Sequence, residues 1–231
     1  NNIFVYYLAS QVGTVGHPAA QNLSAGTGTF TGDVTIGDAS AADKKILFDG
    51  NAQDYHIGLD DSTDSLTIGK GSTLGTTSHM VIDAAGHITK PLQSAFLAIA
   101  SSDQSNIAVG SSVAVVFGTE TFDQNADFTS NTFTAPVTGK YQFNVSVNIR
   151  NVDSAADYYR IKLSTSNTNY HDLFDPDFGQ DAAYWIMRVC VLVDMDANDT
   201  AAINILQNSG TAQTDISGNA VYTFFSGYLV A

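Results

Sequence analysis

A stretch from Lys140 to Arg150 alternates apolar and polar residues without interruption. Its apolar members are Tyr141, Phe143, Val145, Val147 and Ile149. Because successive side chains of a β-strand point to opposite faces, the alternation predicts a strand with one buried face and one solvated face. A whole face of apolar side chains needs a second layer to cover it, so the chain is expected to form at least two packed β layers.

The residues just upstream predict how this strand is entered. Residues 131–139 read Asn-Thr-Phe-Thr-Ala-Pro-Val-Thr-Gly. Proline has no N–H to donate to a β ladder, and a Thr-Gly pair favours a turn. The segment therefore predicts a short strand that ends at the proline and a tight corner into an antiparallel partner.

The same corner resembles a known family. Residues 133–143 read F-T-A-P-V-T-G-K-Y-Q-F, which is similar to the F-x-A-P-x-x-G-x-Y-x-F segment of the complement C1q domain, a member of the tumour necrosis factor-like jelly rolls. Residues 225–230 resemble the closing strand of that family and residues 95–98 its opening strand. Between them, residues 115–117, Phe122 and Phe128 follow in the family's usual order.

This resemblance covers residues 93–231 and implies an all-β fold, a C1q/TNF-like jelly-roll β-sandwich that assembles as a homotrimer. In the family the last strands line the centre of the trimer. The resemblance therefore implies that Tyr222, Phe224 and Tyr228 lie at the trimer interface. Head strands are expected at 95–100, 113–117, 132–136, 140–149, 157–163, 184–193, 201–206 and 221–230.

The composition agrees with an all-β chain. Of the acidic residues 22 are Asp, and only Glu120 is Glu. Asp favours turns and is a poor helix former, so few helices are expected. The net charge of −14, with only nine Lys and Arg, argues against binding to nucleic acid or to anionic membranes. The longest apolar run, Trp185–Val193, contains Arg188 and is too short to span a membrane.

That apolar run also predicts a position in the fold. Both its odd-numbered and its even-numbered positions are mostly apolar, which indicates a central strand or one that faces a threefold axis. Cys190 lies within it and is the only cysteine, so no disulfide can form within one chain. A small buried apolar residue is the expected role of Cys190.

Residues 30–92 predict a separate, repetitive region. Short strands are expected at 30–37, 45–50, 55–59, 66–69 and 80–83, between turns rich in Gly and Asp. Each offers only two or three apolar residues, so neighbouring strands or neighbouring chains must complete the core. The patterns G-T-F-T-G-D-V-T-I-G and I-D-x-x-G-x-I resemble shaft segments of bacteriophage tail fibres, which are trimers of intertwined β-strands. The resemblance implies a trimeric β-rich shaft over residues 30–92, with the boundary at Lys90-Pro91-Leu92.

Residues 1–29 open with the apolar run Ile3–Leu8 and continue with small residues. Two interpretations remain open for this segment. It forms a strand inside the same fold, or it is an attachment segment that inserts into a partner subunit or assembles with copies of itself.

The sequence contains no catalytic motif, so the chain is expected not to be an enzyme. The histidines are scattered and read as solvated or turn residues; they are His17, His56, His79, His87 and His171. Polysaccharide-cutting enzymes use paired carboxylates, but Asp is so frequent here that chance pairs are expected.

Three Asp groups could in principle hold Ca²⁺, which prefers oxygen ligands. They are Asp60, Asp61 and Asp64; Asp172, Asp175, Asp177 and Asp181; and Asp194, Asp196 and Asp199. Solvated turns are the favoured reading of all three. The resemblance keeps the second group as a calcium candidate, because some members of the family bind calcium. No other cofactor is expected.

Aromatic residues gather around the second Asp group. They are Tyr158, Tyr159, Tyr170, His171, Phe174, Phe178 and Tyr184. Aromatic rings beside Asp and Asn are typical of sugar-binding surfaces, although core packing would account for most of them equally well. The hypothesis is that residues 166–183 form an exposed loop in which Tyr170, His171, Phe174 and Phe178 contact a receptor.

These features together favour a viral structural protein. The hypothesis is a homotrimeric bacteriophage fibre on the virion surface, attached to other virion proteins through its N-terminal segment, whose head binds a host-cell glycan or protein. The alternatives are a capsid decoration or cement protein and a non-viral secreted C1q-like lectin or adhesin.

Overall fold

The computed structural model describes residues 27–231, so the run Ile3–Leu8 lies outside the described residues. Contacts divide the chain into two compact units that meet between Ser40 and Ala41. The described residues form strands, turns and coil and contain no helix. The expected all-β class is therefore confirmed.

Residues 27–40 form no strand, so the strand expected at 30–37 is wrong. Phe30, Val34 and Ile36 are all exposed. A strand persists only where its N–H and C=O groups pair with a neighbour, and no segment of the described chain pairs with these residues.

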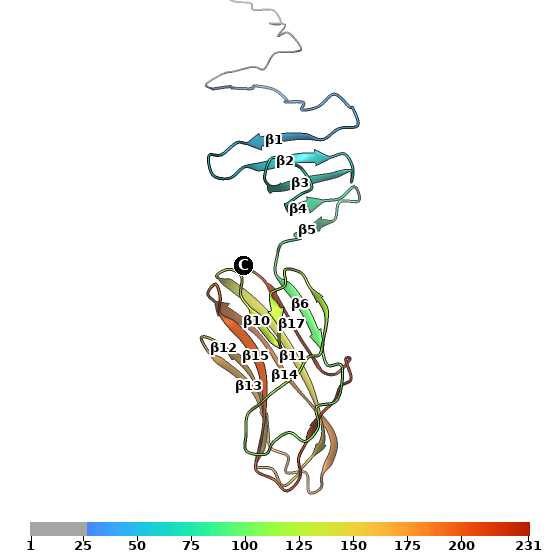
Figure 1. Cartoon of the computed structure of the whole chain (residues 1–231), viewed down its shortest axis with the longest axis vertical. Coiled ribbons are helices and arrows are strands. Elements are labelled where there is room, and N and C mark those ends of the chain that lie inside the picture. Colours follow the sequence, from blue (N-terminus) through green and yellow to red (C-terminus); the bar gives the residue numbers. More distant parts are fainter. Residues whose placement is uncertain (1–26) are drawn as a thin grey trace, which may run out of the picture. The chain divides into compact units, whose positions relative to one another are not determined.

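The first sheet is an antiparallel meander in the order β1-β2-β3-β4-β5 (Figure 1). Its strands are β1 (Lys44–Phe48), β2 (Tyr55–Asp60), β3 (Ser65–Lys70), β4 (Ser78–Ile82) and β5 (Ile88–Thr89). The four strands expected between residues 45 and 83 are confirmed. Asp residues form the turns: the carboxylate of Asp60 accepts hydrogen bonds from the backbone N–H and the hydroxyl of Ser62 (3.1 and 2.7 Å).

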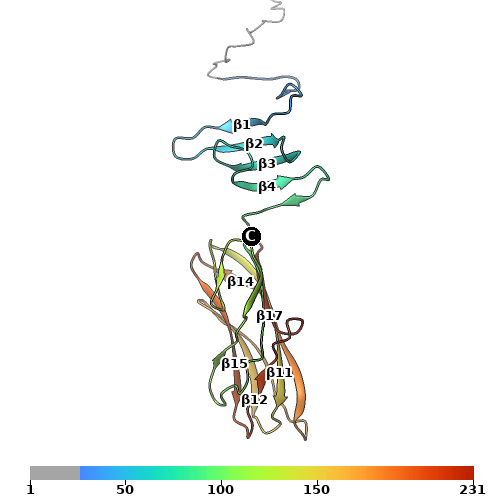
Figure 2. The ribbon, with the colours of Figure 1, turned by 45° about the vertical axis from the view of Figure 1, so that its right-hand side comes forward.

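Two further sheets build a sandwich from the rest of the chain (Figures 1 and 2). One sheet has the order β14-β11-β17-β6-β8, with β16 paired to β11. Its strands are β14 (Ala182–Met195), β11 (Gly139–Val152), β17 (Phe224–Leu229), β6 (Ala95–Ile99), β8 (Thr119–Asp123) and β16 (Asp215–Ile216).

The facing sheet has the order β13-β12-β15-β10-β9, with β7 paired to β15. Its strands are β13 (Asn169–Phe174), β12 (Tyr158–Thr165), β15 (Thr200–Asn208), β10 (Thr132–Thr134), β9 (Phe128–Thr129) and β7 (Val113–Ala114). Most neighbours within each sheet are distant in sequence, and consecutive strands such as β10 and β11 lie in opposite sheets. This crossing pattern is that of a jelly roll.

The core lies between these two sheets. All five apolar residues of the alternating stretch are buried, as the pattern predicts. Phe96 of β6 is central to the packing, because its ring stacks on Phe128 and Phe133 at centroid distances of 4.8 and 5.1 Å. The hydroxyl of Tyr141 donates to the carbonyl of Val137 (2.7 Å) and closes the predicted corner.

Two expectations for the sandwich are wrong. Residues 166–183 are not one exposed loop, because residues 169–174 pair with β12 along their whole length and form β13. Of the two alternatives for the apolar strand β14, the central position is wrong, because within the described residues the strand lies at the end of its sheet and pairs with β11 alone. A position facing a threefold axis stays a prediction. Short polar strands such as β8 and β9 lack an apolar pattern, and the sequence analysis missed them.

Gly227 of β17 yields a test of the core. It pairs with Phe143 and Phe96, and a Cβ atom there would lie 2.5 Å from the Phe143 ring and 2.8 Å from the Phe96 ring. Both rings are almost fully buried, so neither can move away easily. Gly227→Ala should therefore destabilise the fold by about 1–3 kcal/mol, measured by thermal or urea unfolding. Gly32→Ala is the control because its Cβ would meet open space. Equal stability of both variants and the parent would contradict this packing.

Candidate functional surfaces of the jelly roll

The outer face of the sheet that contains β11 carries apolar side chains on both sides of a polar central strand. On β11 the outward residues are Gln142, Asn144, Ser146 and Asn148, of which Ser146 and Asn148 are already buried, whereas the neighbours across the strands are largely apolar. One cross-strand row joins Leu192, Gln142 and Tyr228, and Leu192 and Tyr228 are about half exposed. The face is therefore a mixed surface of the kind that proteins bury on association.

The three interface residues implied by the resemblance lie at or beside this face. Phe224 and Tyr228 project from β17 to the outer side, and Phe224 is half-buried between Ser146 and Ile99. Tyr222 lies in the turn before β17, where its carbonyl accepts a hydrogen bond from the Ser146 hydroxyl (2.8 Å). The sequence analysis missed Leu192 and the half-exposed Phe122 on this face, because their outward direction depends on strand register.

Cys190 also lies on the outer face and is exposed, so its expected burial is wrong. Its Sγ donates to Asn144 Oδ1 (2.9 Å). The physical reason is register: β14 pairs with β11 so that Val189, Val191 and Val193 point into the core, whereas Cys190 and Leu192 between them point outward.

A second candidate surface is an aromatic cluster formed by Phe174, Phe178 and Trp185. Phe174 ends β13, Phe178 lies in the following loop and Trp185 lies near the start of β14. The Phe174 ring stacks on Trp185 at 4.9 Å, and the Phe178 ring lies 5.5 Å from Trp185. Phe178 and Trp185 remain 41% exposed. The cluster is therefore anchored on the core and presents two rings to solvent.

The structure separates the four predicted receptor-contact residues: three lie on the two faces of β13, and Phe178 lies in the loop that follows. Tyr170 and Phe174 are half-buried and pack against the core, whereas His171 points to the opposite, outer side. Phe178 is exposed beside Phe174. The structure thus brings together Phe174 and Phe178 and adds Trp185, which the sequence analysis did not select.

His171 lies across from Lys162 in the β12–β13 register. Burial and the positive charges of Arg160 and Lys162 hold the pKa of His171 below its usual value. His171 is therefore mainly neutral at neutral pH, and protonating it as the pH falls below about 6.5 costs folding free energy.

The Asp residues of the calcium candidate do not converge on one point. Asp172 Oδ2 accepts the N–H of Arg188 (3.0 Å), and Asp175 accepts the N–H of Asp177 (3.2 Å). Asp181 accepts both the N–H and the hydroxyl of Ser154 (2.9 and 2.8 Å). Within residues 27–231, no group of three or more His, Cys, Asp or Glu side chains is arranged to hold a metal ion.

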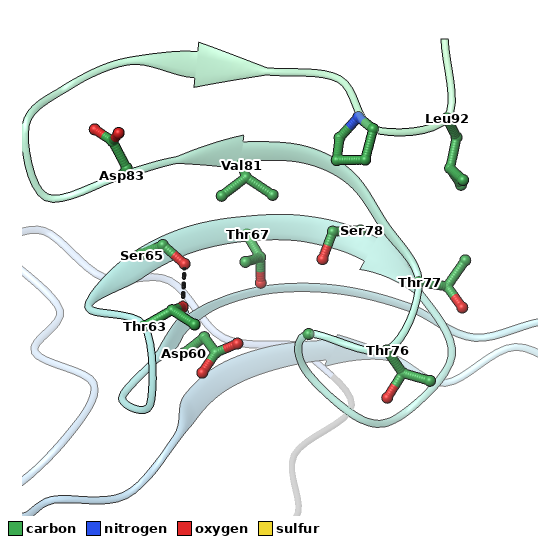
Figure 3. A pocket seen from close by; sticks show the side chains of 12 residues that line it. Asp60, Thr63, Ser65, Thr67, Thr76, Thr77, Ser78, Val81, Asp83 and Leu92 are labelled. Carbon is green, nitrogen blue, oxygen red and sulfur yellow. Dashed lines mark hydrogen bonds between the residues drawn. The ribbon is translucent and has the colours of Figure 1, made fainter. Parts of the chain in front are cut away.

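A cavity of about 580 Å³ lies on the first sheet (Figure 3). Hydroxyl side chains of β3, β4 and the adjoining loop line it together with Asp60 and Asp83. Both carboxylates bond to their own turns: Asp83 accepts the N–H groups of Ala85 and His87, both at 2.9 Å. The side-chain hydrogen bond from His87 lowers the pKa of Asp83, whereas a general acid at neutral pH needs a raised pKa.

Comparison with known proteins finds similarity of fold only. No protein-family model matches the chain, and no curated protein matches it in sequence. Solved structures do match: the globular domain of zebrafish complement 1qA is 17% identical, with a TM-score of 0.43, over 60% of this chain and 98% of that one.

Two tumour necrosis factor-family structures each match over 60% of the chain as well. Murine APRIL is 11% identical with a TM-score of 0.45 over 99% of its own length. The Eiger TNF of S. frugiperda is 10% identical with a TM-score of 0.45 over 93% of its length. This part of the chain is thus similar in fold to C1q and TNF domains, as expected from the resemblance in sequence. Separately, residues 27–231 include no helix suited to crossing a membrane.

The dispersed carboxylates give a prediction about calcium. All acidic residues of the chain fall after residue 32, within the described part. Because none of them form a metal-binding group, adding Ca²⁺ to chelator-treated protein should release no binding heat and leave the melting temperature unchanged. Calorimetry of the full chain is the measurement. A saturable heat, abolished by Asp175→Asn with Asp177→Asn, would contradict the prediction.

Proposed function

We propose that this chain is a homotrimeric fibre protein of a virus particle, a bacteriophage, and that its jelly-roll head binds the host surface. The observation that carries the proposal is the outer face of the β14-β11-β17-β6-β8 sheet. It holds large exposed apolar side chains on strand β14 and strand β17, and β14 is a long edge strand.

Self-association would cover this face. A long edge strand exposes unpaired backbone groups and invites pairing or aggregation unless it is covered. The outward residues of β14 include Ile186 and Leu192, and Leu192 is 52% exposed. Three copies arranged about an axis would bury Leu192 and Tyr228 together with the interface residues Tyr222 and Phe224.

Host binding is supported by the aromatic cluster. Exposed indole and phenyl rings stack on the apolar faces of sugar rings, and Asp175 and Asp177 of the adjoining loop supply hydrogen-bond acceptors for hydroxyls. The cluster is fixed to the core through Phe174, which also stacks on Tyr159 at 5.2 Å. Three such sites on one trimer would act together, so weak single sites suffice for adhesion.

The fibre assignment rests on the resemblance of residues 30–92 to the shaft segments of tail fibres and on the apolar run Ile3–Leu8. We propose that this run attaches the chain to other virion proteins. We also propose that the protein is not an enzyme and acts by binding. The carboxylates that line the 580 Å³ cavity of the first sheet are engaged by their own turns.

The adhesive function is tested with Trp185→Ala combined with Phe178→Ala. Both rings are partly exposed, so the fold should persist while binding to host cells falls about tenfold or more. Phe30→Ala removes an aromatic ring that is 71% exposed outside the jelly roll and is the control. Flow cytometry with the labelled full chain measures binding, and melting curves check the fold. Unchanged binding by the double variant would refute a role for this cluster.

The alternatives differ in where the protein is located. Immunogold labelling of virions should mark fibre tips if the proposal holds. Label spread over the shell would instead indicate a decoration protein. Absence of label from virions, together with glycan binding by the isolated protein, would indicate a secreted lectin or adhesin.

A further inference from the structure

Within residues 27–231, the first sheet has one covered face and one bare face, and the bare face is the apolar one. On the covered side His56, Ser65 and Thr67 are almost fully buried. The loop of residues 71–77 lies over them, held by a hydrogen bond from His56 Nδ1 to the carbonyl of Gly71 (2.8 Å). A side chain at Gly69 would collide with the Thr77 carbonyl at 2.4 Å, so this loop approaches the sheet closely.

The other side consists mainly of apolar side chains in register across the strands, with Lys44 and Lys70 at its margins. One row joins Ile46, Ile57, Ile68 and Met80, each in the middle of its strand. A second row joins Leu59, Leu66, Ile82 and Ile88 and begins at Lys44. A third joins Phe48 to Tyr55 and ends at Lys70. We call this side the apolar face.

The apolar face is too large to remain in water. Its eight most exposed side chains are between 36% and 59% exposed: Ile46, Phe48, Tyr55, Ile57, Leu59, Leu66, Ile68 and Ile88. Side chains of this size at about half exposure present on the order of 700 Å², above the roughly 300–600 Å² of the largest patch on a typical monomer. A stable interface buries ~800 Å² per partner, so the face matches one.

We infer that the apolar face is covered by the same face of two further copies of this chain, arranged around a threefold axis along which the Ile46–Ile57–Ile68–Met80 row runs. The number of copies is taken from the trimer proposed above. That the face is covered by copies of this chain is inferred from the size and chemistry of the face. The strands would lie across the axis, and the flanking rows would pack between adjacent copies.

The shape and chemistry of the face favour copies over other occupants. Each row crosses at least two strands and the central row crosses four, so the cover must be as wide as a sheet. The comparable apolar run in residues 1–26, Ile3–Leu8, is long enough for a single strand, which covers about 5 Å of sheet width. A second copy presents a surface of equal width, equal polarity and the same row spacing.

Thiol protection tests whether the face is covered. In the full chain with Cys190→Ser, Ile57→Cys adds a thiol in the central row and Thr73→Cys adds one in the exposed loop over the covered side. Ile57→Cys should react with maleimide at least tenfold more slowly than Thr73→Cys, and equally fast in denaturant. Ile68→Cys, in the same row, repeats the test if Ile57→Cys folds poorly. Equal native rates would overturn the inference.

Oxidation then identifies what covers the face. Ile57→Cys should form chain-to-chain disulfides on a non-reducing gel, whereas Thr73→Cys should not, because only the axial row faces itself. A protected thiol without such disulfides would assign the cover to residues of the same chain and overturn the inference. Equal reaction rates in a protein that still sediments as a trimer would refute only this inference. Normal protection and disulfides without host binding would refute only the proposed adhesion.

Discussion

A β-sheet has two faces, and residues 27–231 leave one face of the first sheet and part of the outer face of the β11 sheet uncovered. Within the jelly roll, the inner faces cover each other around Phe96 and Phe143. In the first sheet the loop of residues 71–77 covers the polar side and leaves Ile57 and its row bare. Burial of apolar surface is the dominant favourable term in folding and association, so these uncovered faces determine what the chain must do next.

The two uncovered faces differ in character, and the difference suggests different roles. The outer face of the jelly roll places a polar strand, with Gln142 and Asn144, between apolar neighbours. Hydrogen-bonding groups in such a face fix the orientation of a partner. The apolar face of the first sheet carries no polar side chain in the row from Ile46 to Met80 and lysines only at the ends of the flanking rows, so it would supply adhesion between copies with little discrimination. A fibre would combine the two, with assembly strength in the shaft and precise geometry in the head.

Sequence periodicity predicted the parts of the fold in which one side of a strand differs from the other. The stretch from Lys140 to Arg150 became β11 with the expected residues buried. Periodicity could not orient β14, which is apolar at both parities, so Cys190 was placed on the wrong side. It also missed β13, because this strand owes its existence to pairing with β12 rather than to its own pattern.

The sequence indicated only part of the candidate site, because local pattern does not show which strands become neighbours. Phe174 and Phe178 are near in sequence, and their rings lie side by side with centroids 6.1 Å apart. Trp185 joins them only because β14 begins beside the end of β13, a contact between strands that composition cannot reveal. Conversely, Tyr170 and His171 are adjacent in sequence and therefore point to opposite sides of β13.

The central claim is that the single chain is not the functional unit, and sedimentation velocity of the full chain tests it most directly. The account predicts one species with three times the chain mass of 24.4 kDa, persisting on dilution to nanomolar concentration. A stable, soluble species of one chain mass, with both apolar surfaces bare, would contradict it.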